Sequence, residues 1–323
     1  MTTREFTGLH HYRLFGGVLR SDIEIPELER VEPRSPTWTL RSRVGKPPAA
    51  DGVALGSDRV TGDVHVRMYR RASGVRLVFD DTGCFDIVDG GRSIDWTHAP
   101  DVSLDDARAD LTSRVLAAAL HEAGTVCLHG SAVVCGTEAI GFVAPKFHGK
   151  STLALALVNA GARLLTDDTF PVTPGRPPTA FPGLHATRLW EDSARRVGLG
   201  RTEDDGSGSK LLFSSLPSEY VSHATHPLAA LYLLSPAQEP SDGRMAWRTR
   251  LSTMEATLVM IGHAKLAPLL TGPEAPGLFH RAAALAETVP VYRLGVARDL
   301  DRIDEVVATI HEWHVPAPAG AAS

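Results

Sequence analysis

Residues 144–151, which read A-P-K-F-H-G-K-S, have the pattern of a phosphate-binding loop. The backbone N–H groups of such a loop, together with the first turn of the helix that follows it, point toward a bound anion. Lys150 is expected to reach the outer phosphates of a nucleotide, and the hydroxyl of Ser151 is expected to bind Mg²⁺. The chemistry indicated is nucleotide binding followed by phosphoryl transfer.

The loop departs from the usual pattern near its start. Ala144 stands where the first glycine is usual, which narrows the backbone conformations open to the chain. Pro145 has no N–H to offer an anion, whereas Lys146 adds a cation. We therefore expect a reshaped loop in which Lys146 or His148 assists in holding the donor. The predicted nucleotide-binding residues of the loop and first helical turn are Ala144, Lys146, His148, Gly149, Lys150, Ser151 and Thr152.

Two adjacent carboxylates, Asp167 and Asp168, follow the loop at the end of an expected strand over residues 162–166. Phosphoryl transfer to a hydroxyl needs one carboxylate on the metal side and another that orients or deprotonates the acceptor. Adjacent residues at a strand end point in different directions, so the pair can divide these tasks. His129 precedes the loop on another expected strand, and strand ends on one edge of a sheet gather in one crevice. We therefore expect His129, the loop and both carboxylates to share one site.

The loop lies between elements of the kinds that a phosphate loop requires. Residues 139–143 are an apolar run of strand length, and residues 152–160 are mostly good helix formers. Residues 125–135 form another expected strand, which is followed by a turn at Gly136. Strand, loop and helix in this order are the context that makes the motif credible.

The first part of the chain has a different pattern. Over residues 1–102, apolar and polar residues alternate with period two between Gly, Pro and Asp clusters, which is typical of strands. A helix is expected over residues 103–123, with Ser103 at its start and Gly124 just past its end. We expect a β-rich N-terminal domain over residues 1–102. A nucleotide-binding domain is expected over residues 103–315, with the helix as its linking element.

The later part of the chain is expected to alternate strands, helices and loops. Arg188 begins a segment that is expected to be helical up to Val197, and Lys210 follows a polar, glycine-rich loop over residues 203–209. A capping box at residues 252–255 opens a helix. Further elements are expected as strands at 228–234 and 289–294, helices ending near 287 and spanning 300–313, and a disordered tail at 316–323.

The order of these motifs resembles the HPr serine kinase C-terminal-domain family and its diverged kinase relatives. The closely matching segments are 128–133, 149–154 and 161–168, with a looser match at 188–190, 228–234 and 290–294. The resemblance implies an α/β fold, a P-loop kinase core related to phosphoenolpyruvate carboxykinase, and ATP-dependent phosphorylation of a serine-type hydroxyl. It also implies that Asp167 is the base, Asp168 the metal-side carboxylate and His129 a phosphate contact. The sequence alone leaves the two aspartate roles exchangeable.

Other parts of the resemblance concern the substrate. Arg188 resembles a phosphate-side arginine of these relatives, and Lys210 is placed to close over the donor or the acceptor. Thr152 stands where the bifunctional protein kinases carry an acid, and their long C-terminal signature is not visible, which argues against a carrier-protein substrate and against phosphorolysis. Residues 15–28 resemble the front of bacterial relatives found beside peptide-modification genes. A biosynthetic or modification pathway is therefore expected.

Composition excludes several other classes of protein. A formal net charge of -5 over 323 residues provides no basic footprint for nucleic acid. The three cysteines, Cys84, Cys127 and Cys135, have no C-x-x-C spacing, which argues against a zinc site or a disulfide framework and for a reducing compartment. No apolar run approaches the ~20 residues of a membrane span, and the first residues lack a signal-peptide core. We expect a cytoplasmic protein with no nucleic-acid or membrane partner, and we leave a homo-oligomer open.

The leading hypothesis is a magnesium-dependent kinase. It would transfer a phosphoryl group from ATP or another nucleoside triphosphate to a hydroxyl, either a serine of a peptide or protein or a group on a small metabolite. The alternative is a nucleotide-binding partner or sensor protein without chemistry, which the altered loop favours. A carboxykinase-like lyase is a weaker third hypothesis, because the sequence does not supply a His/Lys/Asp metal-binding set.

Overall fold

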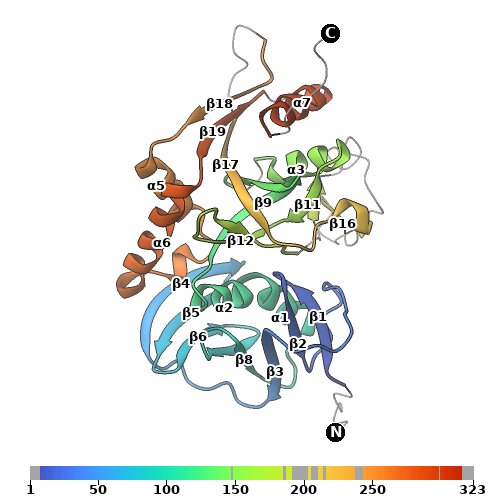
Figure 1. Cartoon of the computed structure of the whole chain (residues 1–323). Coiled ribbons are helices and arrows are strands. Elements are labelled where there is room, and N and C mark those ends of the chain that lie inside the picture. The colour runs from blue at the N-terminus through green and yellow to red at the C-terminus, as the bar shows by residue number, and fades with distance from the viewer. Residues whose placement is uncertain are drawn as a thin grey trace. The chain divides into compact units, whose positions relative to one another are not determined.

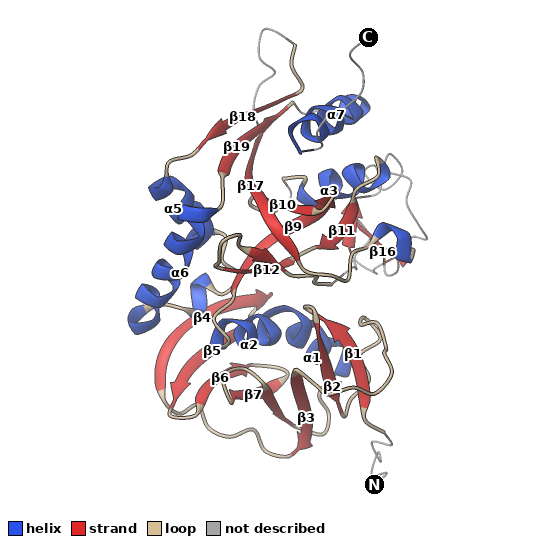
Figure 2. Cartoon of the chain, in the orientation of Figure 1, coloured by secondary structure: helices blue, strands red, loops and turns tan. Residues whose placement is uncertain are grey.

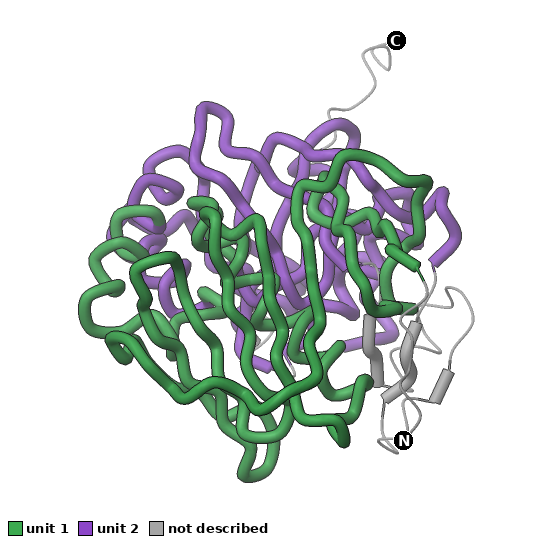
Figure 3. Tube along the Cα trace, turned by 90° about the horizontal axis from the view of Figure 1, so that it is seen from below, with its two compact units in different colours: residues 1–127, 264–281 green, residues 128–263, 282–323 purple. Residues whose placement is uncertain are grey.

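The computed structural model describes residues 8–146, 148–184, 187–190, 203–204, 210–213, 216–236, 243–297 and 299–314. The chain divides into two compact units, which Figure 3 shows in different colours. Unit 1 comprises residues 1–127 and 264–281, and unit 2 comprises residues 128–263 and 282–323. Among the described residues, no helix is both long and apolar enough to cross a membrane.

Unit 1 is built on an eight-stranded sheet in the order β1-β2-β3-β8-β7-β6-β5-β4 (Figures 1 and 2). Its strands pair antiparallel except for β2 with β3 and β3 with β8, which are parallel. The strands are β1 (His10–Leu14), β2 (Gly17–Ser21), β3 (Trp38–Val44), β4 (Val53–Thr61), β5 (Val64–Arg71), β6 (Gly74–Phe79), β7 (Gly83–Val88) and β8 (Ser93–His98). These eight strands all lie between residues 10 and 98.

A helical segment completes the first part of unit 1. It consists of α1 (Leu104–Asp110), a π-helical turn η1 (Leu111–Val115) and α2 (Leu116–Glu122). The predicted helix start is confirmed, since the Ser103 side chain accepts a hydrogen bond from Asp106 N. The hydroxyl of Thr82 donates to the buried carboxylate of Asp110 at 2.7 Å, which ties the helix to the sheet. Unit 1 includes this helical segment, since the division between the two units falls after Cys127.

Three short elements from later in the chain also belong to unit 1. They are the 3₁₀ turns η3 (Ala267–Leu269) and η4 (Gly272–Glu274) and the first part of α6 (Ala275–Thr288). Thr271 N donates to Leu55 O at 3.2 Å, so this segment covers β4 at the edge of the sheet. Covering an edge strand satisfies backbone groups that would otherwise remain open to a second chain.

Unit 2 contains a second sheet in the order β10-β9-β12-β13-β17-β19-β18. In addition, β10 pairs with β17 in parallel, and β11 pairs with β9. The strands are β9 (Val126–Cys135), β10 (Glu138–Val143), β11 (Arg163–Thr166), β12 (Thr169–Thr173), β13 (Thr179–Ala180), β17 (His226–Pro236), β18 (Ala246–Arg250) and β19 (Val291–Val296). Parallel strands joined through helices make this unit mixed α/β, as the sequence predicted.

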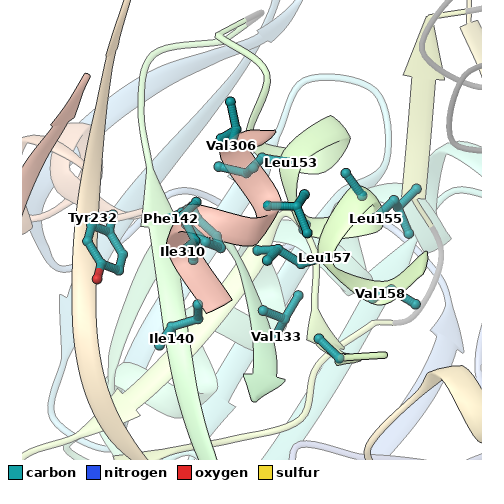
Figure 4. Close-up of a cluster of buried hydrophobic side chains, with 14 of the residues drawn as sticks. Val133, Ile140, Phe142, Leu153, Leu155, Leu157, Val158, Tyr232, Val306 and Ile310 are labelled. Atoms are coloured by element: carbon teal, nitrogen blue, oxygen red, sulfur yellow. The ribbon is translucent and has the colours of Figure 1, made fainter. Parts of the chain in front are cut away.

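The core of unit 2 forms where two helices cover the sheet (Figure 4). The helix α3 (Lys150–Asn159) is buried continuously from Leu153 to Val158, as expected of a helix that is apolar on all sides. It packs with α7 (Ile303–His314), whose Ile310 joins the same cluster as Phe142 of β10. Each fully buried side chain of this size contributes roughly 1.5–3 kcal/mol to folding. The core therefore fixes the position of the first turn of α3, where the phosphate loop ends.

The remaining described elements are α5 (Thr253–Gly262), β14 (Thr187–Trp190), β15 (Glu203–Asp204), β16 (Lys210–Phe213), η2 (Ser218–Tyr220) and η5 (Leu300–Arg302). The capping box predicted at the start of α5 is confirmed by reciprocal hydrogen bonds between Ser252 and Glu255. The prediction that a helix begins at Arg188 is wrong, because Arg188 lies on β14, which pairs with β16. Residues 191–202 and the tail at 316–323 lie outside the described residues.

Candidate active site

The segment predicted to be a phosphate loop joins β10 to α3, in the strand, loop and helix order that the sequence predicted. Gly149 has φ +82°, in the left-handed region that favours glycine, and it caps the helix without a side-chain hydrogen bond. The first N–H groups of α3 therefore have no side-chain cap and can meet an anion. Ala144 is buried, whereas Pro145 and Lys146 are exposed. Phe147 lies outside the described residues.

The ammonium group of Lys150 is held against its own loop. Its Nζ donates to Ala144 O at 2.9 Å and to Pro145 O at 3.2 Å. The Lys150 side chain is buried at 8% exposure, so its charge acts in a poorly hydrated setting. The imidazole of His148 bonds to Lys146 O at 2.9 Å, which also turns it toward the loop. This packing places Lys150 beneath the carbonyl groups of the loop rather than in solvent.

Asp167 is buried and is held by two hydroxyl groups. Ser151, in the first turn of α3, donates to Asp167 Oδ1 at 3.0 Å, and Ser131 of β9 donates to the same oxygen. The backbone of Asp167 is also fixed, because its N–H donates to Leu184 O at 3.2 Å. These bonds fix the orientation of the Asp167 carboxylate.

The side chain of Asp168, unlike that of the buried Asp167, is about half exposed. It has φ +68°, a left-handed conformation that is uncommon outside glycine, asparagine and aspartate. The Nδ1 atom of His129 lies 3.2 Å from Asp168 Oδ1 and 3.2 Å from Asp168 O.

Two side chains on one face of β9 therefore contact the two carboxylates. His129 and Ser131 are two residues apart on this strand, so their side chains share a face. His129 contacts Asp168 and Ser131 contacts Asp167. The two carboxylates are thereby separated, with one at the helix that follows the loop and the other at a half-buried imidazole.

This geometry favours the reverse of the roles that the family resemblance implied. The hydroxyl predicted to bind Mg²⁺, that of Ser151, bonds to Asp167 and not to Asp168. Hydroxyl and carboxylate oxygens suit Mg²⁺, which usually takes one or two carboxylates together with substrate phosphates and water. Asp167, Ser151 and Ser131 fit that donor set. Among the described residues no group of three or more His, Cys, Asp or Glu side chains is arranged to hold a metal ion.

Two residues of the site were missed in the sequence. Ser131 lies two positions after His129 on the predicted strand, and the period-two spacing could have indicated it. His263 caps the C-terminal end of α5, and its carbonyl accepts a hydrogen bond from His129 N at 2.7 Å. Burial lowers the pKa of His263, and the charges of Lys150 and His129 lower it further. No local sequence signal points to His263, because its position depends on the path of a distant helix.

Other predicted residues are placed less completely. Arg188 lies on β14 opposite Leu212, and Lys210 begins β16 opposite Trp190. The side chains of Arg188 and Lys210 lie outside what the structure describes. Thr152 is half-buried in the first turn of α3. The three cysteines are buried, and burial raises the pKa of Cys84 to about 11 and that of Cys127 to about 12, so they act as packing residues.

Comparison with known proteins finds a weak structural likeness. The chain is similar to the HPr(Ser) kinase/phosphatase from Coxiella burnetii, with a TM-score of 0.32 and 13% sequence identity over 58% of this chain and 96% of that chain. No family model matches the sequence, and no curated protein matches it. A TM-score of this size assigns no role to any residue, so the roles proposed below come from side-chain geometry.

Proposed function

We propose that this protein is a nucleotide-dependent kinase that phosphorylates a hydroxyl group. The observation that carries the proposal is the hydrogen bond from Ser151 to Asp167 directly after a phosphate loop. The adjacent Asp168 is half-exposed and pairs with His129, so a second carboxylate faces outward beside the first. A phosphate loop, a metal-side carboxylate and a separate base are the parts that phosphoryl transfer requires.

In the proposed reaction Asp168 accepts the proton of the acceptor hydroxyl. The acceptor oxygen forms a bond to the terminal phosphorus of the donor while the bond between that phosphorus and the bridging oxygen breaks. The products are the phosphorylated acceptor and the nucleoside diphosphate, and the proton resides on Asp168 until solvent removes it. The N–H on His129 Nδ1 holds Asp168 in place for this step. A positioned base of this kind contributes typically about 10²–10⁴-fold to the rate.

The phosphates of the donor would meet the N–H groups at the start of α3. Lys150 would leave the carbonyl groups of Ala144 and Pro145 and turn toward the phosphates, since a charged oxygen is a better partner than a neutral carbonyl. Asp167 and Ser151 would hold Mg²⁺, which when bound neutralises charge on the donor phosphates. The acceptor is proposed as a serine-type hydroxyl of a peptide or protein, or a hydroxyl of a small metabolite, within a biosynthetic or modification pathway.

A second function, nucleotide binding without chemistry, is favoured by one observation. Pro145 lacks an N–H, and its carbonyl together with that of Ala144 already binds the Lys150 ammonium. A loop whose carbonyl groups already bind Lys150 could hold a nucleotide without transferring its phosphate. In this case the protein would act as a sensor or as a partner in an assembly.

Transfer of the labelled terminal phosphate from ATP or GTP separates these two functions. We would present the wild-type protein and the Asp168→Asn variant with Mg²⁺, serine-containing peptides and a panel of hydroxyl metabolites. The kinase proposal predicts a labelled acceptor with the wild type and a loss of about 10²-fold or more in the variant. Tight nucleotide binding with no labelled product on any acceptor would favour the sensor function.

A further inference from the structure

The two neighbouring carboxylates lie on an unusually narrow turn of the backbone. Thr169 N donates to Asp167 O at 2.9 Å, and the single residue enclosed by this hydrogen bond, Asp168, has φ +68°. A bond of this span around a positive φ is typical of the rare and strained form of the γ-turn. Strained backbone persists only where the surrounding structure holds it, and such positions gather at functional sites. Another part of the protein must therefore hold Asp168 in this conformation.

The hydroxyl of Thr166 closes this turn from inside the protein. It donates to Thr169 O at 2.5 Å, so the residue before the two carboxylates is bonded to the residue after them. Thr166 and Thr169 are both fully buried. A Cβ atom at Gly183 would overlap Thr166 Oγ1, so the backbone of Gly183 packs directly against this hydroxyl. Because a buried hydroxyl without its acceptor is unfavourable, the bond to Thr169 keeps the turn closed.

The turn brings a single side chain out of a buried segment. Between residues 164 and 172 every residue is buried except Asp168, whose side chain is 51% exposed. The strand that leads into the turn is fixed as well, since Gly183 N donates to Leu165 O at 3.0 Å. Asp168 Oδ1 lies 3.2 Å from His129 Nδ1. The position of the exposed carboxylate is therefore set by the turn beneath it and by His129 beside it.

We propose that Thr166 is a positioning residue whose hydroxyl holds the strained turn that aims Asp168 at the acceptor. Thr166 is fully buried, so it acts through Asp168 and not on the donor or the acceptor. Since Asp168 is the base only within the proposed function, this role depends on that function. A reacting group displaced by about 1 Å can lose roughly 10²-fold in rate. Loss of the Thr166 hydroxyl should therefore slow phosphoryl transfer without weakening nucleotide binding.

Two substitutions of Thr166 test this role. Thr166→Val keeps the shape of the side chain and removes its hydroxyl, whereas Thr166→Ser keeps the hydroxyl. The matched control is Thr112→Val on η1, where a buried threonine likewise donates to a backbone carbonyl, that of Arg108. Single-turnover transfer is measured with labelled ATP, Mg²⁺ and serine-containing peptides, and ATP affinity is measured by calorimetry.

The substitutions should affect transfer and binding differently. We expect Thr166→Val to bind ATP within about threefold of the wild type and to transfer its phosphate at least about tenfold more slowly. Thr166→Ser and the control should stay within about threefold of the wild type in both measurements. Equal transfer by the wild type and Thr166→Val would overturn the positioning role. A fall in ATP affinity as large as the fall in transfer would overturn it too, because that pattern indicates general damage to the fold.

A double variant shows whether Thr166 acts through Asp168. Added to Asp168→Asn, the substitution Thr166→Val should slow transfer by no more than about twofold further, because residues that act as a unit are not additive. A further loss of about tenfold would overturn the role, since the two residues would then act independently.

The ring ¹⁵N resonances of His129 provide a readout that needs no transfer. Because His129 Nδ1 contacts Asp168, these signals should move in Thr166→Val and stay in place in Thr166→Ser. If the wild type labels no acceptor, the kinase proposal fails, whereas a moved His129 signal still supports the hold of Thr166 on Asp168 and an unmoved signal overturns it. If Thr166→Val does not fold, Thr166→Cys takes its place, because a thiol is only a weak donor. A His129 signal in Thr166→Cys that equals that of the wild type would likewise overturn the role.

Discussion

The hydroxyl of Ser151 donates to Asp167 at 3.0 Å, which connects the first turn of the helix after the phosphate loop to a buried carboxylate. This relationship is the reason why the proposed mechanism gives Asp167 the metal-side role. Asp168 has a left-handed backbone, and its carboxylate pairs with His129. The two neighbouring carboxylates can therefore be tested separately, because their substitution should affect different steps.

Asp167→Asn and Asp168→Asn should have different kinetic effects. Replacement of Asp167 removes a charge from the metal side, so we expect the Mg²⁺ concentration needed for nucleotide binding to rise about tenfold or more. Replacement of Asp168 removes the base, so we expect nucleotide binding within about threefold of the wild type and a loss of transfer of about 10²–10⁴-fold. Calorimetric binding and single-turnover transfer, measured on both variants, check this. If the two effects are exchanged between the variants, the role assignment is wrong.

Ser131→Ala should weaken metal-dependent binding although Ser131 is fully buried and distant in sequence from the loop. Its hydroxyl donates to Asp167 Oδ1, and hydrogen bonds to charged groups contribute about 1.5–3 kcal/mol. We expect the apparent affinity for Mg²⁺ in the presence of nucleotide to fall about tenfold. Ser57→Ala, at an exposed position of β4, is the matched control and should show no change. An Mg²⁺ affinity for Ser131→Ala equal to that of the control would contradict a positioning role.

Gly183→Ala should disturb the turn that carries the carboxylates. A Cβ atom at Gly183 would overlap Thr166 Oγ1 and lie 2.9 Å from Thr169 O. These two threonines flank Asp167 and Asp168, and overpacking of this kind costs typically about 1–3 kcal/mol. We expect a lower free energy of unfolding in urea together with weaker nucleotide binding. Gly45→Ala is the control, because a Cβ atom there meets nothing within 4 Å.

The buried carboxyl group of Asp110 should make the free energy of unfolding depend on pH. Burial raises the pKa of Asp110 to about 6, and the hydrogen bond from Thr82 only partly opposes that rise. Because this pKa is above the unfolded value, the native state binds more protons than the unfolded state between about pH 4 and 6. The carboxyl therefore lowers the free energy of unfolding as the pH rises through that window, by about 3 kcal/mol for about two pKa units.

Asp110→Asn removes this ionisation while it keeps the shape and an acceptor for Thr82. We expect the variant to be more stable than the wild type at pH 8, by up to about 3 kcal/mol, with the difference shrinking as the pH falls from about 6 to about 4. Urea unfolding at several pH values measures it, with Asp63→Asn at an exposed turn as the control. A stability difference that does not vary with pH would show that packing, and not ionisation, is responsible.

The sequence predicted those features that depend on local pattern. The strand, loop and helix around Gly149 follow from apolar runs on either side of the G-K-S motif, and the start of α1 follows from Ser103. The strand β4 was not predicted, because Gly56 and Asp58 interrupt the alternation, and its edge is covered by residues such as Thr271 that lie far along the chain. Arg188 was expected to start a helix, although it pairs within a strand ladder instead.

The roles within the site required the three-dimensional structure. The adjacent residues Asp167 and Asp168 read alike in a sequence, and the structure distinguishes them by their partners, Ser151 for Asp167 and His129 for Asp168. His263 reaches the site through a backbone contact with His129, which no local pattern encodes. The extent of unit 1 likewise depends on contacts such as the one between Thr82 and Asp110, which join a strand turn to a helix.

The most direct measurement of the central claim is calorimetric titration of the wild-type protein and Lys150→Met with ATP or GTP, in Mg²⁺ and again in EDTA. The account predicts saturable binding by the wild type that weakens at least about tenfold without Mg²⁺, because Asp167 and Ser151 hold the ion against the phosphates. It predicts that Lys150→Met loses binding by about tenfold or more, since a charge-assisted contact is removed. Binding of both nucleotides that is unaffected by EDTA and by Lys150→Met, or no binding at all, would contradict a phosphate loop that serves phosphoryl transfer.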